Sequence, residues 1–340
     1  MAVLAERIDL MVRLGEYFRS GNEDWQQAAE LAQRQNGWFT QEFISLATDN
    51  IATAFLDRKQ LEAWIRKYPG IQDTPGERSV GIVMAGNIPL VGFHDFLCGY
   101  ISGHKLRIKL SSKDTVLWQH IFRLLSSWDN SFTQQVTEAD MLKGCDAYIA
   151  TGSNNSARYF EQYFAKYPHI IRKNRTSVAV LDGSETNEEL QQLADDVCVY
   201  FGLGCRNITK VFVPRDYNFE NLLPVFNKYS HHSDHNKYKN NYDYQLALYL
   251  LNKVNYMSNG NLLMVAAESP YAPISVLHYG YYQDKDQLLK SLNEDDQIQC
   301  IEVKAPEAAI KKAVSIGASQ QPALDDYADG VDTMAFLAAL

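Results

Sequence analysis

Hydrophobic residues in the first seventy positions recur at the spacing of an amphipathic α-helix. Leu4, Ile8 and Met11 lie close to one face of such a helix, and similar spacing continues as far as Trp64. From Ser79 onward, short β-branched runs alternate with longer amphipathic segments. The expected strands are 79–85, 105–110, 146–151, 177–181, 210–213, 261–266 and 297–303, and the expected helices between them are 89–101, 115–127, 154–166, 188–200 and 242–254. The pattern therefore predicts a helical N-terminal region followed by a longer α/β region.

The repeated order of strand, helix and strand predicts the architecture of the α/β region. Strands that are joined by helices form right-handed crossovers, and such strands make a parallel sheet covered on both faces. The chain has 340 residues, which is enough for two domains. We therefore predict the α/β class with two parallel-sheet domains. In such sheets, ligands bind where the strands end and the helices begin.

The charge and composition of the chain exclude some classes of binding partner. The 32 basic and 41 acidic residues give a net charge of −9, and no basic stretch is long enough to follow a phosphate backbone. Nucleic acid and anionic membrane surfaces are therefore not expected as partners. No apolar run approaches the roughly 20 residues that span a bilayer, and charged residues interrupt the N-terminal segment. We expect a soluble, cytoplasmic protein whose five cysteines, none in Cys-x-x-Cys spacing, are reduced thiols.

Cys205 lies at one strand–helix junction, in the sequence Phe-Gly-Leu-Gly-Cys-Arg-Asn. The neighbouring glycines let the backbone and a substrate approach closely, and Arg206 would favour a thiolate. A thiolate here could attack an acyl carbon and form a covalent thioester. Equally, Cys205 could be a small buried apolar residue, as most free cysteines are. The other four cysteines are expected in the core.

Three further junctions carry groups that suit an oxyanion or a nucleotide, and each also has a structural interpretation. Asn87, at a strand end, could donate its amide to a developing oxyanion or cap the next helix. The cations and hydroxyls of segment 105–114 could hold a phosphate or a ribose, or form a solvated edge. The run Thr151-Gly152-Ser153 could bind a pyrophosphate at a helix N-terminus or serve as an ordinary N-cap.

A metal site is not expected. His231 and His235 are four residues apart, as in some zinc sites. They lie in what the sequence predicts to be a polar loop, however, and the glutamate of a His-Glu-x-x-His motif is missing.

The order of these features along the chain is more specific than any one of them. A strand followed by Asn and Pro, a strand ending in Lys, a Thr-Gly-Ser turn and a Gly-flanked Cys occur in that order between about Ser79 and Val213. This order resembles the aldehyde dehydrogenase superfamily, and especially its fatty acyl-CoA reductases named for bacterial luminescence, the LuxC-type branch. The phrases that carry the resemblance are Gly86-Asn-Ile-Pro-Leu, Lys109-Leu-Ser-Ser-Lys-Asp, Ala150-Thr-Gly-Ser, Arg172-Lys-Asn-Arg-Thr-Ser-Val-Ala-Val-Leu and Asp325-Asp-Tyr-Ala-Asp-Gly-Val-Asp.

The resemblance implies an aldehyde dehydrogenase-like fold with a Rossmann-type cofactor domain and a catalytic domain. On that basis we expect residues 1–173 to form the helical N-terminus and the nicotinamide cofactor-binding domain. Residues 174–325 would form the catalytic domain, and residues 326–340 a C-terminal tail. Cys205 matches the nucleophile of the family. Asn87 matches the asparagine that stabilises the oxyanion together with the nucleophile's own backbone N–H.

The same resemblance implies a cofactor site. Lys109 matches the lysine that holds the adenosine ribose, and Gly152 and Ser153 match the pair that contacts the pyrophosphate. The neighbouring residues expected at the cofactor are Ser111, Ser112, Lys113 and Thr151, and those considered for a substrate phosphate are Arg172, Lys173 and Arg175.

Two departures from the superfamily pattern refine the expected chemistry. Aldehyde-oxidising members carry a glutamate within a Glu-Leu-Gly-Gly-Lys phrase, and aligning that phrase to 171–175 places Ile171 at the acid position. An isoleucine cannot activate water, so the acyl-enzyme is expected to resist hydrolysis. Members that favour NAD often have a carboxylate three residues after the lysine, where this chain has Ser112 followed by Lys113. A serine in place of the carboxylate, followed by a lysine, would admit the 2′-phosphate of the cofactor. These residues therefore favour NADPH over NADH.

The resemblance therefore implies reduction of a fatty acyl-CoA, or another acyl thioester, to the fatty aldehyde. The expected route is an acyl-Cys205 intermediate with NADPH as the cofactor and no metal. Two alternatives remain open: an acyl-transferring or acyl-holding protein that uses Cys205 without redox chemistry, and a reductase of a small acyl phosphate. We also expect a homo-oligomer without a membrane span, with an acyl-transferring protein as a candidate partner.

Overall fold

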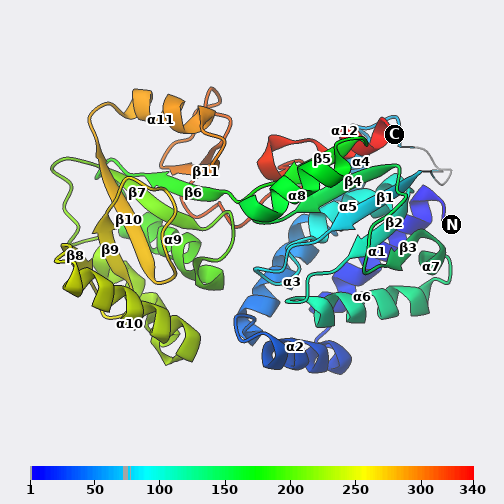
Figure 1. The fold of residues 1–340 in the computed structure, drawn as a ribbon, viewed down its shortest axis with the longest axis horizontal. Coiled ribbons are helices and arrows are strands. Elements are labelled where there is room, and N and C mark those ends of the chain that lie inside the picture. Colours follow the sequence, from blue (N-terminus) through cyan, green and yellow to red (C-terminus); the bar gives the residue numbers. More distant parts are fainter. Residues whose placement is uncertain (1, 72–75, 77) are drawn as a thin grey trace. The chain divides into compact units, whose positions relative to one another are not determined.

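The computed structural model describes residues 2–71, 76 and 78–340 (Figure 1). The chain forms two compact units. Unit 1 comprises Met1–Asn174 and Pro322–Leu340, and unit 2 comprises Arg175–Gln321. Residues 326–340, which were expected to form a C-terminal tail, therefore belong to unit 1, as do residues 322–325, which were expected in the catalytic domain. Each unit contains one sheet, and the two are described separately.

The sheet of unit 1 has strand order β3-β2-β1-β4-β5, and every neighbouring pair is parallel (Figure 1). The strands are β1 (Ser79–Val83), β2 (Lys105–Lys109), β3 (Val136–Glu138), β4 (Ala147–Thr151) and β5 (His169–Arg172). Because all of them run in one direction, their carboxyl ends lie along the same edge of the sheet. β2 lies between β3 and β1, so the interpretation of segment 105–114 as a solvated edge strand is wrong.

Helices pack on one face of this sheet. The side chains of Leu106 and Ile108 on β2, together with Val80 and Ile82 on β1, are buried in the main core of unit 1. The aromatic ring of Trp118 fills that core and is fully buried. The helical elements of unit 1 are α1 (Leu4–Arg19), α2 (Glu23–Gln35), α3 (Gln41–Ala54), α4 (Arg58–Ile65), α5 (Phe93–Ser102), α6 (Thr115–Trp128), α7 (Phe132–Gln135), α8 (Asn154–Phe164), η3 (Ala328–Gly330) and α12 (Thr333–Ala338). The helical character expected for the first seventy residues is confirmed.

Polar side chains fix the C-terminal segment to unit 1. The indole Nε1 of Trp64 donates a hydrogen bond of 2.7 Å to the hydroxyl of Tyr327. The hydroxyl of Tyr68 contacts the same tyrosine at 2.6 Å and donates to Asp332 at 2.9 Å. Since Tyr327 is buried, this network ties the chain end to α4 and its following turn.

The sheet of unit 2 has strand order β12-β11-β6-β7-β10-β9-β8. Its neighbouring strands are parallel except for the terminal pair β9 and β8, which is antiparallel. The strands are β6 (Thr176–Val180), β7 (Ile208–Pro214), β8 (Tyr256–Ser258), β9 (Leu263–Ala266), β10 (Val276–Tyr282), β11 (Ile298–Val303) and β12 (Ala313–Ser315). The prediction of an α/β protein with two parallel-sheet domains is confirmed.

Helices also bury the sheet of unit 2. Leu289 and Leu292 of α11 pack on the aliphatic side chains of β6 and β11. Tyr242 of α10 packs on β9 and β10. The helical elements are α9 (Asn187–Cys198), η1 (Val199–Gly202), η2 (Leu223–Asp234), α10 (Asn236–Leu251) and α11 (Lys285–Glu294). In the described parts of both units, none of the helices combines the length and apolar content that a membrane crossing requires.

Candidate active site

Cys205 lies in unit 2 on an irregular loop that leaves α9 and enters β7. Three successive residues of this loop have left-handed backbone conformations: Tyr200 (φ 54°), Phe201 (φ 55°) and Gly202 (φ 73°). Non-glycine residues rarely adopt this region, and each costs of the order of 1–3 kcal/mol. The loop therefore keeps its shape only if its surroundings hold it.

The side chain of Asn207 holds this loop from within. It is completely buried. Its Nδ2 donates hydrogen bonds of 2.9 Å to the carbonyl oxygens of Asp196 and Val199, and its Oδ1 accepts one of 2.7 Å from the backbone N–H of Gly204. One side chain thus joins the end of α9 to the residue that precedes Cys205. The sequence analysis did not single out this asparagine, although an Asn two residues beyond a Gly-Cys pair is the type of residue that bridges a tight loop.

Ser177, on β6, contacts the loop of Cys205 from the sheet. Its hydroxyl donates a hydrogen bond of 3.0 Å to the carbonyl of Cys205 and accepts one of 3.1 Å from the backbone N–H of Cys300. The guanidinium of Arg206 donates to Cys300 Sγ at 3.1 Å. A favourable effect of Arg206 on a Cys205 thiolate stays a prediction.

The five thiols differ in exposure. Cys205 is half-buried, whereas Cys98, Cys145, Cys198 and Cys300 are buried. Burial raises the pKa of the Cys98, Cys145 and Cys198 thiols, because a thiolate is poorly solvated in the core. The expectation that these other cysteines lie in the core is confirmed, and Cys205 is the thiol that a substrate can reach most readily.

The histidines of segment 231–235 support the same loop. The rings of His232 and His235 lie 4.7 and 4.6 Å from the ring of Phe201, measured between centroids. Burial, with a smaller contribution from the two neighbouring histidines, lowers the pKa of His232 to about 3. Across the described residues, no cluster of three or more His, Cys, Asp or Glu side chains has the arrangement of a metal site.

In unit 1 the remaining candidate residues gather along the carboxyl edge of the parallel sheet. Gly86 follows β1 and lies against Ser111, which follows β2: a Cβ at Gly86 would be 2.5 Å from Ser111 Oγ. Gly152 follows β4, where a Cβ would be 2.9 Å from that of Ser156. Side chains of the protein itself therefore pack against both glycines at adjacent strand ends, and a Cβ at either position would not fit without movement of its neighbour.

Asn87 lies on this edge and is exposed. It does not cap the next helix, because α5 begins at Phe93 with Gly92 as its N-cap, so the capping interpretation is wrong. The turn that follows Asn87 is fixed by Asp114, whose buried carboxylate accepts a hydrogen bond of 2.7 Å from the backbone N–H of Leu90. Asp114 is a second residue that the sequence analysis did not assign.

The residues proposed for the cofactor occupy the ends of β2 and β4. Lys109 is the last residue of β2, and its side chain is exposed, as are those of Ser112 and Lys113. The backbone carbonyl of Lys113 accepts a hydrogen bond of 3.1 Å from Asn36, which follows α2. The N-terminal helices therefore help to position the turn after β2.

The turn after β4 begins α8. Ser153 is the N-cap of this helix, and its hydroxyl accepts a hydrogen bond of 3.3 Å from the backbone N–H of Ser156. Thr151 is the last residue of β4, and the backbone N–H of Gly152 donates to the carbonyl of Arg172 at 3.2 Å. The interpretation of this turn as the N-cap of a helix is confirmed. Its role in binding a pyrophosphate stays a prediction.

The three basic residues considered for a substrate phosphate have different surroundings. Arg172 is buried in unit 1, where it pairs with Asp95 at 2.7 Å and donates to Thr333 at 2.7 Å. Lys173 pairs with Glu161 at 2.8 Å on the surface. Arg175 is half-buried and is the first residue of unit 2. Arg172 therefore serves the packing of unit 1, and a role of these three residues at a substrate phosphate stays a prediction.

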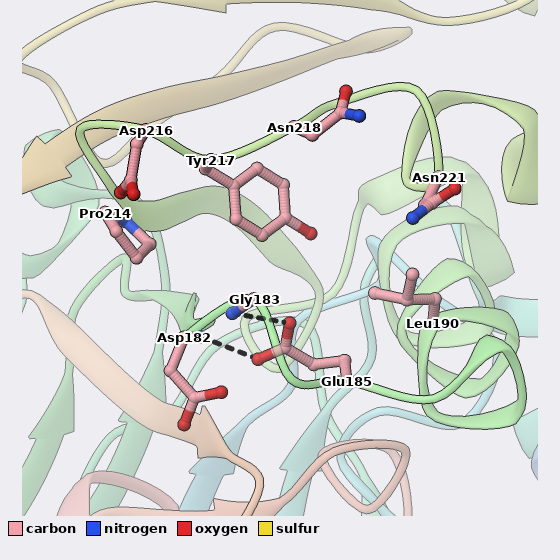
Figure 2. Close-up of a pocket in the computed structure, with 9 residues that line it drawn as sticks. All are labelled: Asp182, Gly183, Glu185, Leu190, Pro214, Asp216, Tyr217, Asn218 and Asn221. Atoms are coloured by element: carbon pink, nitrogen blue, oxygen red, sulfur yellow. Dashed lines mark hydrogen bonds between the residues drawn. The ribbon is translucent and has the colours of Figure 1, made fainter.

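Unit 2 also contains a cavity of about 310 Å³ at the carboxyl ends of β6 and β7 (Figure 2). Cys205 precedes the other end of β7, so this cavity is separate from the loop of Cys205. Figure 2 shows the carboxylate of Glu185 turned toward the backbone of Asp182 and Gly183, from which it accepts hydrogen bonds of 2.6 and 3.1 Å. Asp182 pairs with Lys285 at 3.0 Å. Two of the acidic side chains that line the cavity, Glu185 and Asp182, therefore already have partners within the protein. The lining residues are Asp182, Gly183, Glu185, Leu190, Pro214, Asp216, Tyr217, Asn218 and Asn221.

Solved structures with the same fold are aldehyde dehydrogenases. The indole-3-acetaldehyde dehydrogenase of P. syringae, solved in complex with NAD+, is 14% identical with a TM-score of 0.66, and the match covers 94% of this chain and 75% of that one. An aldehyde dehydrogenase of Bacillus cereus gives 14% and 0.66 over 90% and 72% of the two chains. A putative aldehyde dehydrogenase of Anabaena variabilis gives 13% and 0.65 over 98% and 90%. The chain therefore has the aldehyde dehydrogenase fold.

The sequence narrows the class further. Residues 46–221, more than half of the chain, match the family model described as acyl-CoA reductase (LuxC). No curated protein sequence matches the chain. The chain belongs to the LuxC acyl-CoA reductase family and is an oxidoreductase.

Proposed function

We propose that this protein reduces a long-chain fatty acyl-CoA to the fatty aldehyde with NADPH, through an acyl thioester on Cys205. The observation that carries the proposal is the placement of Cys205. It is the half-buried thiol of the chain, and it lies on a left-handed loop that Asn207 and Ser177 hold by buried hydrogen bonds. Left-handed backbone at non-glycine residues is strained, and strained backbone is concentrated at functional sites.

The protein's own residues perform most of the chemistry. The Cys205 thiolate attacks the carbonyl carbon of the acyl thioester, and the carbonyl oxygen becomes an oxyanion. The amide of Asn87 and the backbone N–H of Cys205 donate hydrogen bonds to that oxyanion, in the roles their family matches imply. When the carbonyl re-forms, the bond to the coenzyme A sulfur breaks and the acyl group remains on Cys205. After reduction, the bond to Cys205 Sγ breaks in the same way, which releases the aldehyde and restores the thiolate.

The carboxyl edge of the unit 1 sheet suits a nicotinamide dinucleotide. When bound, NADPH supplies the hydride that reduces the acyl carbon. Lys109 and Ser111 would hold the adenosine ribose, with Ser112 and Lys113 beside its 2′-position. Thr151, Gly152 and Ser153 would contact the pyrophosphate. Two observations support this placement: Lys109, Ser112 and Lys113 are exposed at the end of β2, and Ser153 is the N-cap of α8.

The lack of an acid at the position of Ile171 distinguishes this reductase from aldehyde-oxidising enzymes. Ile171 is half-buried on β5. An alkyl side chain cannot remove a proton from water, and general-base assistance is typically worth about 10²–10⁴-fold. The acyl-Cys205 thioester is therefore expected to persist until it is reduced.

The test is to mix the protein with a long-chain acyl-CoA, omit NADPH and follow its intact mass. We expect one acyl group per chain, retained over many minutes and located on Cys205 by peptide mapping. Addition of NADPH should remove the adduct with release of aldehyde. Cys205→Ala should form no adduct, while Cys198→Ala should behave like the wild type.

Each alternative has its own result in this experiment. An adduct that NADPH leaves unchanged would identify an acyl-holding or acyl-transferring protein. An adduct formed from acetyl phosphate but not from acyl-CoA would identify a reductase of small acyl phosphates. Rapid, continuous release of free fatty acid without NADPH would contradict the role given to Ile171.

A further inference from the structure

The chain that leads from β1 to α5 passes through a strained residue. Leu90 has a φ of 54°, in the left-handed region that non-glycine residues rarely adopt, and its side chain is buried. Its backbone carbonyl accepts a hydrogen bond of 2.9 Å from the N–H of Phe93, the first residue of α5. Because Leu90 closely follows Asn87, its conformation determines how the backbone leaves Asn87. Such a conformation persists only where its surroundings hold it.

The carboxyl group of Asp114 holds this turn. Its Oδ2 accepts a hydrogen bond of 2.7 Å from the backbone N–H of Leu90. Asp114 also lies against Gly86, because a Cβ added at Gly86 would be 3.3 Å from the Cβ of Asp114. Gly86 precedes Asn87 in the chain, and Leu90 follows it. One buried side chain therefore contacts the turn on both sides of Asn87.

Asp114 makes this contact in place of the usual local role of its residue type. It is the N-cap of α6, where an aspartate normally accepts a hydrogen bond from the second or third backbone N–H of its own helix. Within α6, all of which the structure describes, the side chain of Asp114 makes no such capping bond. The stability of α6 therefore does not explain the aspartate at this position, whereas the contact with Leu90 does.

We propose that Asp114 is a positioning residue that orients the amide of Asn87 toward the oxyanion formed when Cys205 is acylated. This inference rests on the proposed function, in which Asn87 is an oxyanion donor. In this role Asp114 contacts no reacting atom and acts through the backbone. Without an acceptor for its N–H, Leu90 leaves the left-handed region, and the turn then moves Asn87 out of place. A displacement of about 1 Å at a catalytic group can cost 10²-fold in rate.

The rate at which Cys205 is acylated tests the proposal without involving the cofactor. The protein is mixed with palmitoyl-coenzyme A in the absence of NADPH, and the adduct is followed by quenched-flow intact mass. We expect Asp114→Ala to be acylated about 10²-fold more slowly than the wild type. Asp114→Asn keeps an oxygen that can accept from the Leu90 N–H, so it should recover most of that loss. If Asp114→Ala is too unstable to purify, Asp114→Leu removes the acceptor and still fills the space.

A double-mutant cycle shows whether Asp114 and Asn87 act as one unit. If Asp114 acts through Asn87, its removal costs nothing further once the amide is gone. The variant with both Asn87→Ala and Asp114→Ala should therefore be acylated within about twofold of Asn87→Ala alone. Independent effects would instead multiply to about 10⁴-fold or more. A merely structural role of Asp114 would not remove that multiplication.

The matched control is Asp146→Ala. The carboxylate of Asp146 accepts a hydrogen bond of 2.7 Å from the backbone N–H of Ser79, at the opposite end of β1. Both aspartates thus hold backbone next to the same strand, but only Asp114 contacts the turn that contains Asn87. Asp146→Ala should lose stability in denaturant unfolding and keep the acylation rate of the wild type. Equal slowing in Asp146→Ala and Asp114→Ala would overturn the proposal, because general loosening of β1 would then explain both.

The remaining results separate this proposal from the proposed function. A wild type that forms no adduct on Cys205 contradicts the proposed function itself. If the wild type is acylated and Asn87→Ala is slow, a wild-type rate in Asp114→Ala overturns the proposal and leaves the function intact. Losses that multiply in the double variant also overturn it, because Asp114 would then act apart from Asn87. A wild-type rate in Asn87→Ala does so too, since Asp114 would have no oxyanion donor to position.

Discussion

The two regions that carry the candidate site are built in different ways. In unit 1 the candidate residues lie at the ends of regular parallel strands, and the side chains of Asn87, Lys109, Ser112 and Lys113 are exposed. In unit 2 the half-buried Cys205 lies on a loop whose backbone is left-handed. The parallel sheet alone suffices to position strand ends along one edge. A strained loop, in contrast, needs specific partners.

This difference predicts how each region responds to mutation. An exposed side chain at a strand end can be removed with little effect on folding, so its loss should act on binding or on catalysis alone. The nucleophile loop depends on the buried amide of Asn207, whose removal leaves three backbone groups without their partner. Stability and activity should therefore fall together in unit 2 and separately at these exposed residues of unit 1.

The largest expected effect is that of Asn87→Ala. Removal of one oxyanion donor typically lowers kcat by about 10²–10³, or roughly 2.7–4 kcal/mol. The free energy of unfolding should change by no more than about 0.5 kcal/mol, because Asn87 is exposed. Steady-state kinetics and denaturant unfolding measure the two quantities, with Asn130→Ala, an exposed asparagine before α7, as the control. An Asn87→Ala enzyme that retains most of its kcat would assign the residue to the turn.

The sequence predicts unit 1 better than the nucleophile loop for the same physical reason. β1 and β4 are short apolar runs and β2 alternates apolar and basic residues, and each is followed by turn residues, so their positions and their carboxyl ends follow from the hydrophobic pattern. The Arg172–Asp95 ion pair and the hydrogen bond from the backbone N–H of Leu90 to Asp114 join residues that are far apart in sequence. No local pattern in the sequence indicates either contact. The sequence also does not predict the left-handed backbone at Tyr200 and Phe201, because aromatic residues rarely adopt that conformation.

The sequence predicts neither sheet completely: β3 and β5 of unit 1 and β8, β10 and β12 of unit 2 have no counterpart among the expected strands. β10 contains Gly280 and a run of tyrosines, so it lacks the alternation that marks a half-buried strand. β8 and β12 each have only three residues, which is too short for a pattern to be recognised. The family resemblance identified Cys205 where its local sequence left two interpretations open.

The next largest effect is expected for Asn207→Ala. Unpaired buried groups cost about 1–3 kcal/mol each to leave unsatisfied, and a shift of a catalytic group by about 1 Å can cost 10²-fold in rate. We expect a loss of stability together with a 10- to 100-fold fall in kcat. The rate of Cys205 alkylation by iodoacetamide under native conditions should fall as well, which a purely structural loss would not require.

The matched control for this prediction is Asn261→Ala. Asn261 is also buried in unit 2, and its Nδ2 donates to the carbonyl oxygens of Phe226 and Tyr229 at 3.3 and 3.1 Å. This variant should lose stability and keep the alkylation rate of Cys205. Equal alkylation rates in Asn207→Ala and the wild type would show that Asn207 does not position the nucleophile.

The smallest effect concerns pH and sharpens the comparison between the units. Burial lowers the pKa of His232 to about 3 in the folded protein, whereas the side chain has its ordinary value of 6.5 when unfolded. Below pH 6.5 the unfolded chain takes up a proton that folded unit 2 does not, so stability is complete above that pH and falls as the pH decreases toward 3. The loss is at most about 1.4 kcal/mol per pH unit for one such group.

This acid sensitivity can be assigned to one unit because the five tryptophans all lie in unit 1. Tryptophan fluorescence follows the unfolding of unit 1, while far-UV circular dichroism follows both units. Burial also lowers the pKa of His104 and His120 in unit 1 and of His278 in unit 2, so both transitions in urea should move to lower concentration when the pH falls from 7.5 to 5.5. The larger lowering of the His232 pKa should move the dichroism transition further and separate it from the fluorescence transition. His232→Asn should reduce that separation, because the titrating group is gone, although its packing on Phe201 is weakened at every pH. His169→Asn, which removes an exposed histidine of unit 1, should leave the separation unchanged. If His232→Asn retained the full pH dependence, the acid sensitivity would belong to other groups, and the nucleophile loop would not be the part of the molecule that acid weakens first.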